Sequence, residues 1–144
     1  MRPFNHTVRW LFPLLALLGS AVGGRATDFR VIANQSVPVS SLSSDDLKNI
    51  FLGTKTALQD GSHVEPALLQ SGAVHEAFAR QLIGKTGFAL EAYYRSLVFT
   101  GRGLMPKTLS SDADMVRHVA KTRGAVGYVS AETSLTGVKA LGVE

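Results

Sequence analysis

The chain has no cysteine among its 144 residues, so disulfide bonds, thiolate metal sites and cysteine nucleophiles are excluded. It also has no Walker phosphate loop, no dinucleotide-binding fingerprint and no nucleophile elbow. His63, His75 and His118 do not have the spacing of metal ligands. The sequence therefore predicts no enzymatic activity, no cofactor and no metal site.

Acidic residues are absent from the first 27 positions, whereas Arg2, Arg9 and Arg25 lie there. Beyond Ala26, 12 basic residues stand against 11 acidic ones, a net charge of +1. The formal net charge of +4 is thus mostly a property of the first residues. Because no basic stripe remains, we expect no nucleic-acid partner.

The first 26 residues have a positively charged start, then an apolar run over residues 10–22, and then small residues. This order is typical of a secretory signal peptide, with cleavage after Gly23 or after Ala26. The alternative is a retained membrane anchor, although the run is short for a membrane span. We therefore expect a signal peptide over 1–26, a single domain over 27–144 and a periplasmic or other exported location.

Strand and helix patterns alternate along the rest of the chain. Apolar runs predict strands over residues 29–33, 64–69, 125–129 and 137–143. Helices are predicted from capping residues and apolar periodicity, with caps at Ser43 or Ser44, Ser71, Thr86 and Ser111. This alternation favours an α/β fold in which helices pack on a mixed sheet.

The predicted helix start at Ser71–Val74 is small and polar, with Gly72 and Ala73 between. The first N–H groups of a helix have no internal partner, so small residues there allow an anion to approach. The alternative is that Ser71 only caps its own helix. We name Ser71, Gly72, Ala73 and Val74 as candidate ligand-binding residues.

Two further polar features accompany this helix start. Asn34, Gln35 and Ser36 follow the first strand, and ligands of open α/β sheets gather at the carboxyl ends of strands. We therefore expect this loop to share one edge with Ser71, the alternative being a solvated loop. Arg102 lies between two glycines and suits an oxyanion, or it is simply an exposed side chain.

Several motifs follow one another along the chain, at residues 41–53, Asp60-Gly61, Ser71 with 76–78, 99–103, 124–129 and 137–141. Their order resembles the PstS-like family of phosphate ABC-transporter substrate-binding proteins. The resemblance implies one lobe of a type II periplasmic-binding-protein-like fold. It also implies that the ligand is an inorganic oxyanion and that the partner is an ABC importer.

The match departs from the family at the helix start itself. Phosphate binders of the family carry Gly-Ser-Gly-Thr there, with an Arg shortly before it, where this chain has Ser71–Val74 and Leu68. Each lost charge-assisted donor costs about 1.5–3 kcal/mol, so we expect weak binding. The alternative function is a ligand-free accessory or protein-interaction module, which binds an envelope protein or self-associates.

Overall fold

The computed structural model describes residues 28–144, and the expected signal peptide over 1–26 lies outside them. Five strands form the main sheet, in the order β4-β3-β5-β1-β6. They are β1 (Phe29–Asn34), β3 (Glu65–Leu69), β4 (Lys107–Leu109), β5 (Ala125–Ser130) and β6 (Val138–Ala140). A separate parallel pair joins β2 (Ser41–Leu42) to β7 (Gly142–Val143).

The sheet is mixed, because β3 runs parallel to β4 and β5 whereas β1 runs antiparallel to β5 and β6. This confirms the predicted α/β fold with a mixed sheet and flanking helices. The expected last strand over 137–143 divides at Leu141 into β6 and β7, which pair with different partners. The short strands β2 and β4 were not predicted.

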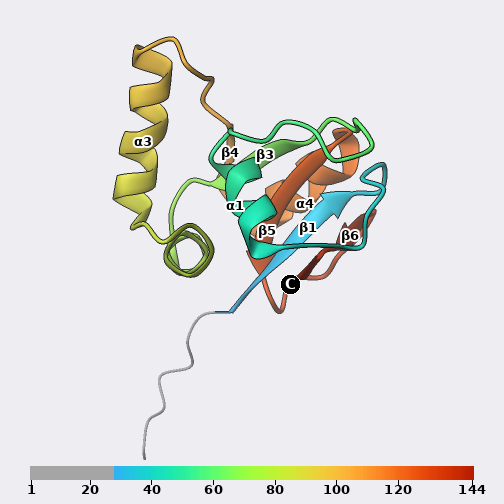
Figure 1. Ribbon diagram of the computed structural model, residues 1–144. Helices are drawn as coiled ribbons and strands as arrows, with labels where there is room; N and C mark the ends of the chain where they lie inside the picture. The colour runs from blue at the N-terminus through green and yellow to red at the C-terminus, as the bar shows by residue number, and fades with distance from the viewer. Residues whose placement is uncertain (1–27) are drawn as a thin grey trace, which may run out of the picture.

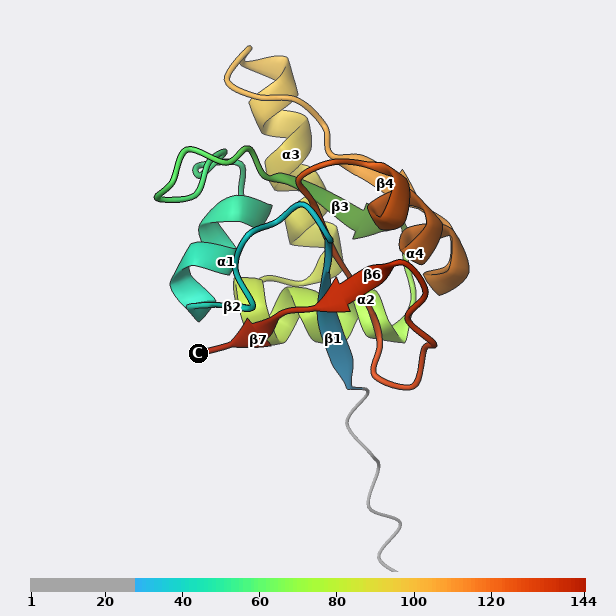
Figure 2. The same cartoon turned by 90° about the vertical axis from the view of Figure 1, so that its right-hand side faces the viewer.

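The helices are α1 (Ser44–Phe51), α2 (Ala73–Phe78), α3 (Gly87–Phe99) and α4 (Asp112–Lys121), and a π-helical turn η1 (Ala79–Ile83) continues α2. Figure 1 shows α1 and α4 beside the sheet, with α3 standing apart at its side. Figure 2 shows the C-terminus beside β7, near the start of α1.

Strand β5 divides the core into two layers because its successive side chains point to opposite faces. A side chain added at Gly127 would meet Met115 and Val119 of α4. Tyr128 instead stacks on Phe78 of α2, with ring centroids 3.7 Å apart. Phe51 of α1 packs edge-on against Phe78 at 4.7 Å. Helix α4 therefore covers one face of the sheet, and α1 and α2 cover the other.

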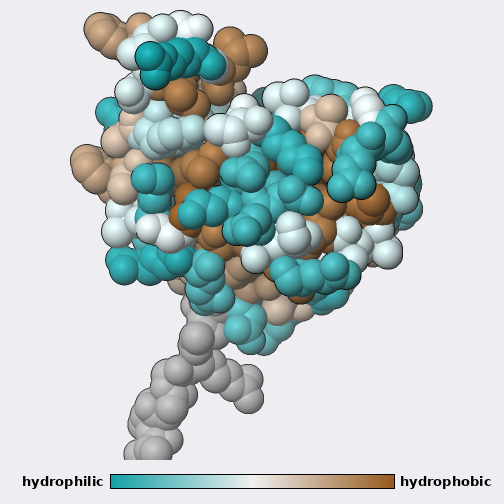
Figure 3. Space-filling view, viewed as in Figure 1, coloured by the Kyte–Doolittle hydropathy of each residue, from teal (hydrophilic) through white to brown (hydrophobic). Residues whose placement is uncertain are grey.

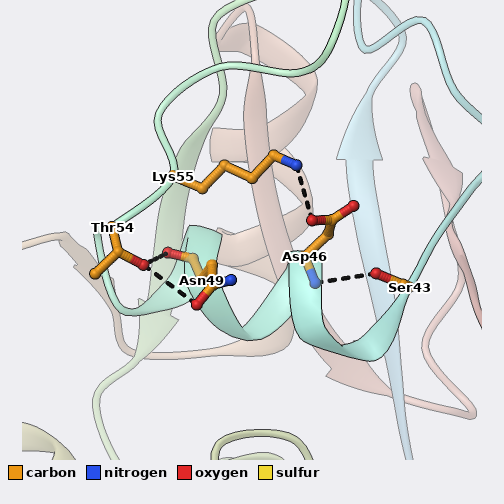
Figure 4. Close-up of polar contacts among 5 residues, drawn as sticks. All are labelled: Ser43, Asp46, Asn49, Thr54 and Lys55. Atoms are coloured by element: carbon orange, nitrogen blue, oxygen red, sulfur yellow. Dashed lines mark hydrogen bonds and ion pairs between the residues drawn. The ribbon is translucent and has the colours of Figure 1, made fainter.

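The capping predictions are confirmed at three helices. The hydroxyls of Ser43, Thr86 and Ser111 each accept a hydrogen bond, at 3.1 Å, from the backbone N–H three residues later. Figure 4 shows the first of these with the contacts that fix the following loop: Asp46 pairs with Lys55 at 2.8 Å, and Thr54 donates to Asn49. The loop after α1 is thereby held against the helix.

The predicted cap at Ser71 is wrong. Helix α2 begins one residue later, with Gly72 in the capping position and no side-chain hydrogen bond there. Gly72 has φ 105°, a conformation that glycine adopts without the steric cost of a Cβ. The turn from β3 into α2 thus depends on the backbone of Gly72 and leaves the Ser71 hydroxyl exposed.

Candidate ligand-binding site

A cavity of about 380 Å³ opens where β3 ends and α2 begins. Ser71 and Gly72 line one side, and Glu91 and Tyr94 of α3 line the other. His75 lies on the wall that α2 contributes. The structure thus places the predicted Ser71–Gly72 loop beside a cavity, formed together with α3.

The backbone of the Ser71–Val74 loop offers hydrogen-bond donors. In the described residues, Gln70 donates its N–H to Leu109 at 2.8 Å, and Glu76 donates to Gly72 at 3.0 Å. No hydrogen bond from the N–H groups between these two residues is found within residues 28–144. These unpaired donors are the expected feature of a helix start.

A buried pair of polar side chains, His75 and Tyr128, lies behind this loop. The Tyr128 hydroxyl accepts the Leu69 N–H at 3.0 Å and lies 2.6 Å from Nδ1 of His75. With the Tyr128 proton directed to Nδ1, the proton of neutral His75 lies on Nε2. Burial lowers the pKa of His75, and the nearby Glu76 and Glu91 oppose the shift. His75 is therefore neutral at pH 7 and presents an N–H donor.

Sequence reasoning did not select His75 or Tyr128, although two signals were present. His75 lies three residues before Phe78 on the inner face of α2, and Tyr128 alternates with Gly127 along a buried strand. These periodicities place both side chains inward. Their hydrogen bond depends on the packing of α2 against β5, which periodicity does not specify.

Tyr94 borders the same cavity with a hydroxyl that is buried and has no hydrogen-bond partner among the described residues. Its side chain is almost fully buried, at 1% exposed. Burial raises the pKa of Tyr94 well above its ordinary value, so the phenol stays protonated. A buried hydroxyl without a partner is costly unless something supplies one.

The charges that line the cavity are negative. Glu76 and Glu91 lie in its wall, and no lysine or arginine lines it in the described part of the chain. Glu76 accepts the Gly87 N–H at 3.2 Å and pairs with Arg80 at 3.6 Å, while Glu91 pairs with Arg95 at 3.1 Å. An anion in this cavity would depend on neutral donors.

The expectation that Asn34, Gln35 and Ser36 share an edge with Ser71 is wrong. Because β1 runs antiparallel to β5 and β3 runs parallel to it, the carboxyl ends of β1 and β3 point in opposite directions along the sheet. The Asn34 amide donates to the carbonyls of Val119 and Ala120, and Ser36 accepts the Gly124 N–H at 3.0 Å. Both side chains thus hold the structure together at the far edge.

Gln35 and Arg102 are exposed, and neither joins the Ser71 cavity. Arg102 lines a second cavity, between the loop after α1 and the loop after α3. Of the eight sequence-predicted residues, the structure brings Ser71 and Gly72 to one cavity, with Ala73 and Val74 directly following. It does not bring Arg102 or the 34–36 loop to that cavity.

Residues 28–144 hold no cluster of three or more histidine or acidic side chains suited to a metal ion. None of the helices in this part of the chain is long and apolar enough to cross a bilayer.

Several solved structures share this fold. An ABC-type phosphate transport receptor from Vibrio cholerae superposes with a TM-score of 0.62 at 18% identity, over 81% of this chain and 46% of that one. PstS from Borrelia burgdorferi gives 0.61 at 15% identity, over 82% and 47%. A protein from Clostridium perfringens, described as a putative phosphate ABC transporter substrate-binding protein with bound phosphate, gives 0.54 at 17%, over 81% and 45%.

The chain has the fold of one part of the PstS-like substrate-binding proteins. It spans about half the length of the solved structures that it matches. No family model and no curated protein matches the sequence. At these low identities the likeness concerns the fold, which confirms the sequence resemblance at that level.

Proposed function

We propose that the chain is an exported, non-enzymatic solute-binding domain that weakly binds phosphate or a related oxyanion and passes it to an ABC importer. One observation carries the proposal: Ser71 and Gly72, whose N–H groups have no hydrogen-bond partner within residues 28–144, line the same cavity as Tyr94. Proteins of the same fold are named for phosphate transport.

The donors assigned to the ion are neutral. In the proposed site the backbone N–H groups of residues 71–74 are the main donors, and Nε2 of His75, which also lines the cavity, adds a further one. Since Glu76 and Glu91 repel an anion, we expect the protein to bind the oxyanion weakly. Arg102 and the 34–36 loop have no part in this version of the site.

Thermal unfolding of the purified protein with phosphate, sulfate or arsenate tests the proposal. At ten times the dissociation constant, binding adds about 1.4 kcal/mol to the free energy of unfolding, which raises Tm by several degrees. Sodium chloride at the same ionic strength is the control for screening. Absence of an ion-specific shift at millimolar concentrations would contradict the proposal.

Matched variants locate the ion. Ser71→Glu places a carboxylate at the helix start and should abolish the shift, whereas Gln35→Glu, at an exposed residue beyond the opposite end of the sheet, should keep it. Glu76→Gln removes a negative charge but keeps an oxygen for the Gly87 N–H, so it should enlarge the shift. Equal shifts in all three variants would place the ion elsewhere.

A second candidate function is a ligand-free accessory or interaction module on the same scaffold. The absence of a lysine or arginine from the described cavity wall favours it. The two candidates differ in one measurement, since this module would show no Tm shift with any oxyanion.

Export is tested separately by cell fractionation and by the intact mass of the purified protein. A mature chain that begins at Gly24 or Thr27 would match the expected signal peptidase sites. A membrane-bound chain that retains residues 1–26 would support the alternative of an anchor.

A further inference from the structure

Helix α3 exposes a row of side chains opposite the ones that pack on the domain, and at its first turn Phe88 also borders the Ser71 cavity. Phe88, Ala92, Arg95 and Phe99 recur at spacings of four, three and four residues, so they lie along one stripe of the helix. We call these four residues with Glu91 the outer face of α3. Phe88 is 75% exposed and Phe99 is 92% exposed, and Figure 3 shows separate hydrophobic side chains at the surface in the region of α3.

The opposite side of the same helix already packs on the domain. Leu90 and Tyr94 are buried, and Tyr93 donates its hydroxyl to the Leu52 carbonyl at 2.7 Å. Helix α3 therefore has apolar side chains on two sides, a pattern typical of a helix that is buried all round. In the described structure one of those sides has no cover.

The exposed area suits a protein interface. A phenylalanine side chain buries about 150–250 Å², so Phe88 and Phe99 with the flanking Val98 and Met105 expose roughly 500 Å² of apolar surface. A standard interface buries about 800 Å² per partner. Glu91, Arg95 and Ser96, which adjoin the apolar residues in one shallow groove, supply the polar remainder.

The order of residues on the outer face is self-complementary. Suppose that two copies of α3 pair antiparallel through their outer faces, with the two-fold axis crossing the helix at the level of residues 93 and 94. Phe88 of one copy then meets Phe99 of the other. In the same register Ala92 meets Arg95, so the smallest side chain faces the longest. A two-fold pair needs this property, because each copy offers the same surface to the other.

We propose that the outer face of α3 docks on the same face of a second copy of the chain, as an antiparallel helix pair. Within one copy, Glu91 pairs with Arg95 at 3.1 Å, and both side chains are more than half exposed. In the pair, each Arg95 lays its aliphatic stem over Ala92 of the other copy and reaches its Glu91. Each Arg95 thus exchanges the Glu91 of its own copy for the Glu91 of the other, so every charge stays paired. The four phenylalanine side chains of the pair are meanwhile removed from water.

Oligomeric state is the first test. Light scattering of the purified protein over a wide concentration range should give a dimer that dissociates on dilution. Phe99→Asp should weaken dimerisation tenfold or more, because it places a charge at an apolar contact. Val143→Asp, at an exposed apolar residue outside α3, should leave the dimer unchanged. Circular dichroism checks that both variants keep the fold.

A charge exchange tests the register. Glu91→Arg alone and Arg95→Glu alone each set like charges against one another in a homodimer, so each should be monomeric. Mixing the two variants pairs two arginines on one copy with two glutamates on the other, so heterodimers should form. A helix face that binds any other occupant predicts no such recovery.

Two results would overturn the proposal. One is a protein that stays monomeric at every concentration, whether the outer face is free or covered by residues 10–22 of its own chain. The other is a dimer that survives both Phe99→Asp and the single charge variants, since such a dimer would use another surface. Because Phe88 and Glu91 also line the Ser71 cavity whereas Phe99 does not, the Tm shift with oxyanions is measured on the Phe99→Asp variant as well, which separates anion binding from dimerisation.

Discussion

At the scale of single residues, the polar core beside the cavity depends on one phenol. The Tyr128 hydroxyl serves the Leu69 N–H and His75 at once, from a ring that is fully buried against Phe78. A buried donor that loses its partner bears the full cost of having left water. The hydroxyl therefore matters more to stability than one hydrogen bond would suggest.

Tyr128→Phe should destabilise the protein by about 1–3 kcal/mol, because it leaves the Leu69 N–H without its acceptor. Urea denaturation measures the change. Tyr93→Phe is the control, since it removes a half-buried hydroxyl from the Leu52 carbonyl and should cost only about 0.5–1.5 kcal/mol. Equal losses in the two variants would contradict the shared role of the Tyr128 hydroxyl.

His75 makes stability depend on pH. Burial lowers the pKa of His75 below its ordinary value of 6.5, so the unfolded chain takes up a proton at a higher pH than the folded one does. The free energy of unfolding is then fully retained above about pH 6.5 and decreases as the pH falls through that value.

His75→Asn keeps an acceptor for Tyr128 but does not titrate, so it should flatten the stability profile between about pH 7 and pH 5. Urea midpoints at several pH values measure the slope. Burial and Lys107 lower the pKa of His118 as well, so His118→Asn is the matched control that separates the second contribution. A profile that His75→Asn leaves unchanged would contradict the assignment.

At the scale of elements, helix α4 lies close to the sheet because β5 has a glycine beneath it. A Cβ at Gly127 would lie 2.5 Å from Sδ of Met115 and 3.2 Å from Cγ2 of Val119. Gly127 thus has a packing role inside this strand, whereas the sequence predicts only a strand over residues 125–129.

Gly127→Ala should therefore cost about 1–3 kcal/mol, the range for overpacking a core. Gly103→Ala is the matched control, since its Cβ would lie 3.4 Å from Leu97, an ordinary contact, and its φ is not positive. That control should be neutral or stabilising by about 0.4–1 kcal/mol. Thermal unfolding compares the two, and equal effects would argue against close packing at Gly127.

Predictions that depend on neighbouring residues were confirmed, whereas one that depends on strand direction was wrong. Caps at Ser43, Thr86 and Ser111 are local, because each hydroxyl bonds three residues along the chain. The edge shared by Asn34 and Ser71 was a tertiary inference, and it failed because β1 enters the sheet antiparallel to β5. Alternating apolar runs specify that a strand exists but do not specify its direction.

At the scale of the whole molecule, the fold class followed from the alternation of strands and helices, whereas the position of α3 did not. Leu90 and Tyr94 are four residues apart on one face of α3, and both are buried. Its outer residues Phe88 and Phe99 carry the same apolar signal and are exposed. The sequence shows which side chains are apolar, and only the structure shows which of them are packed against other described residues.

The distribution of stability across the molecule should follow this arrangement. Strand β5 lies at the centre of the sheet between β3 and β1, and residues 125–129 are buried. Its amides should exchange with solvent only through global unfolding, whereas the end of α3 beyond Tyr94 should exchange by local fraying. Hydrogen exchange with mass spectrometry, on a dilute sample in which dimers dissociate, measures the difference.

Raising the protein concentration should slow exchange in α3 and leave β5 unchanged, because the helix pair covers only the outer face. A dilute sample in which α3 exchanges as slowly as β5 would show that the helix is held by the domain alone. Exchange that is slow in β5 and concentration-dependent only in α3 would tie the uncovered apolar side of the helix to its dimerisation, separately from the cavity at Ser71.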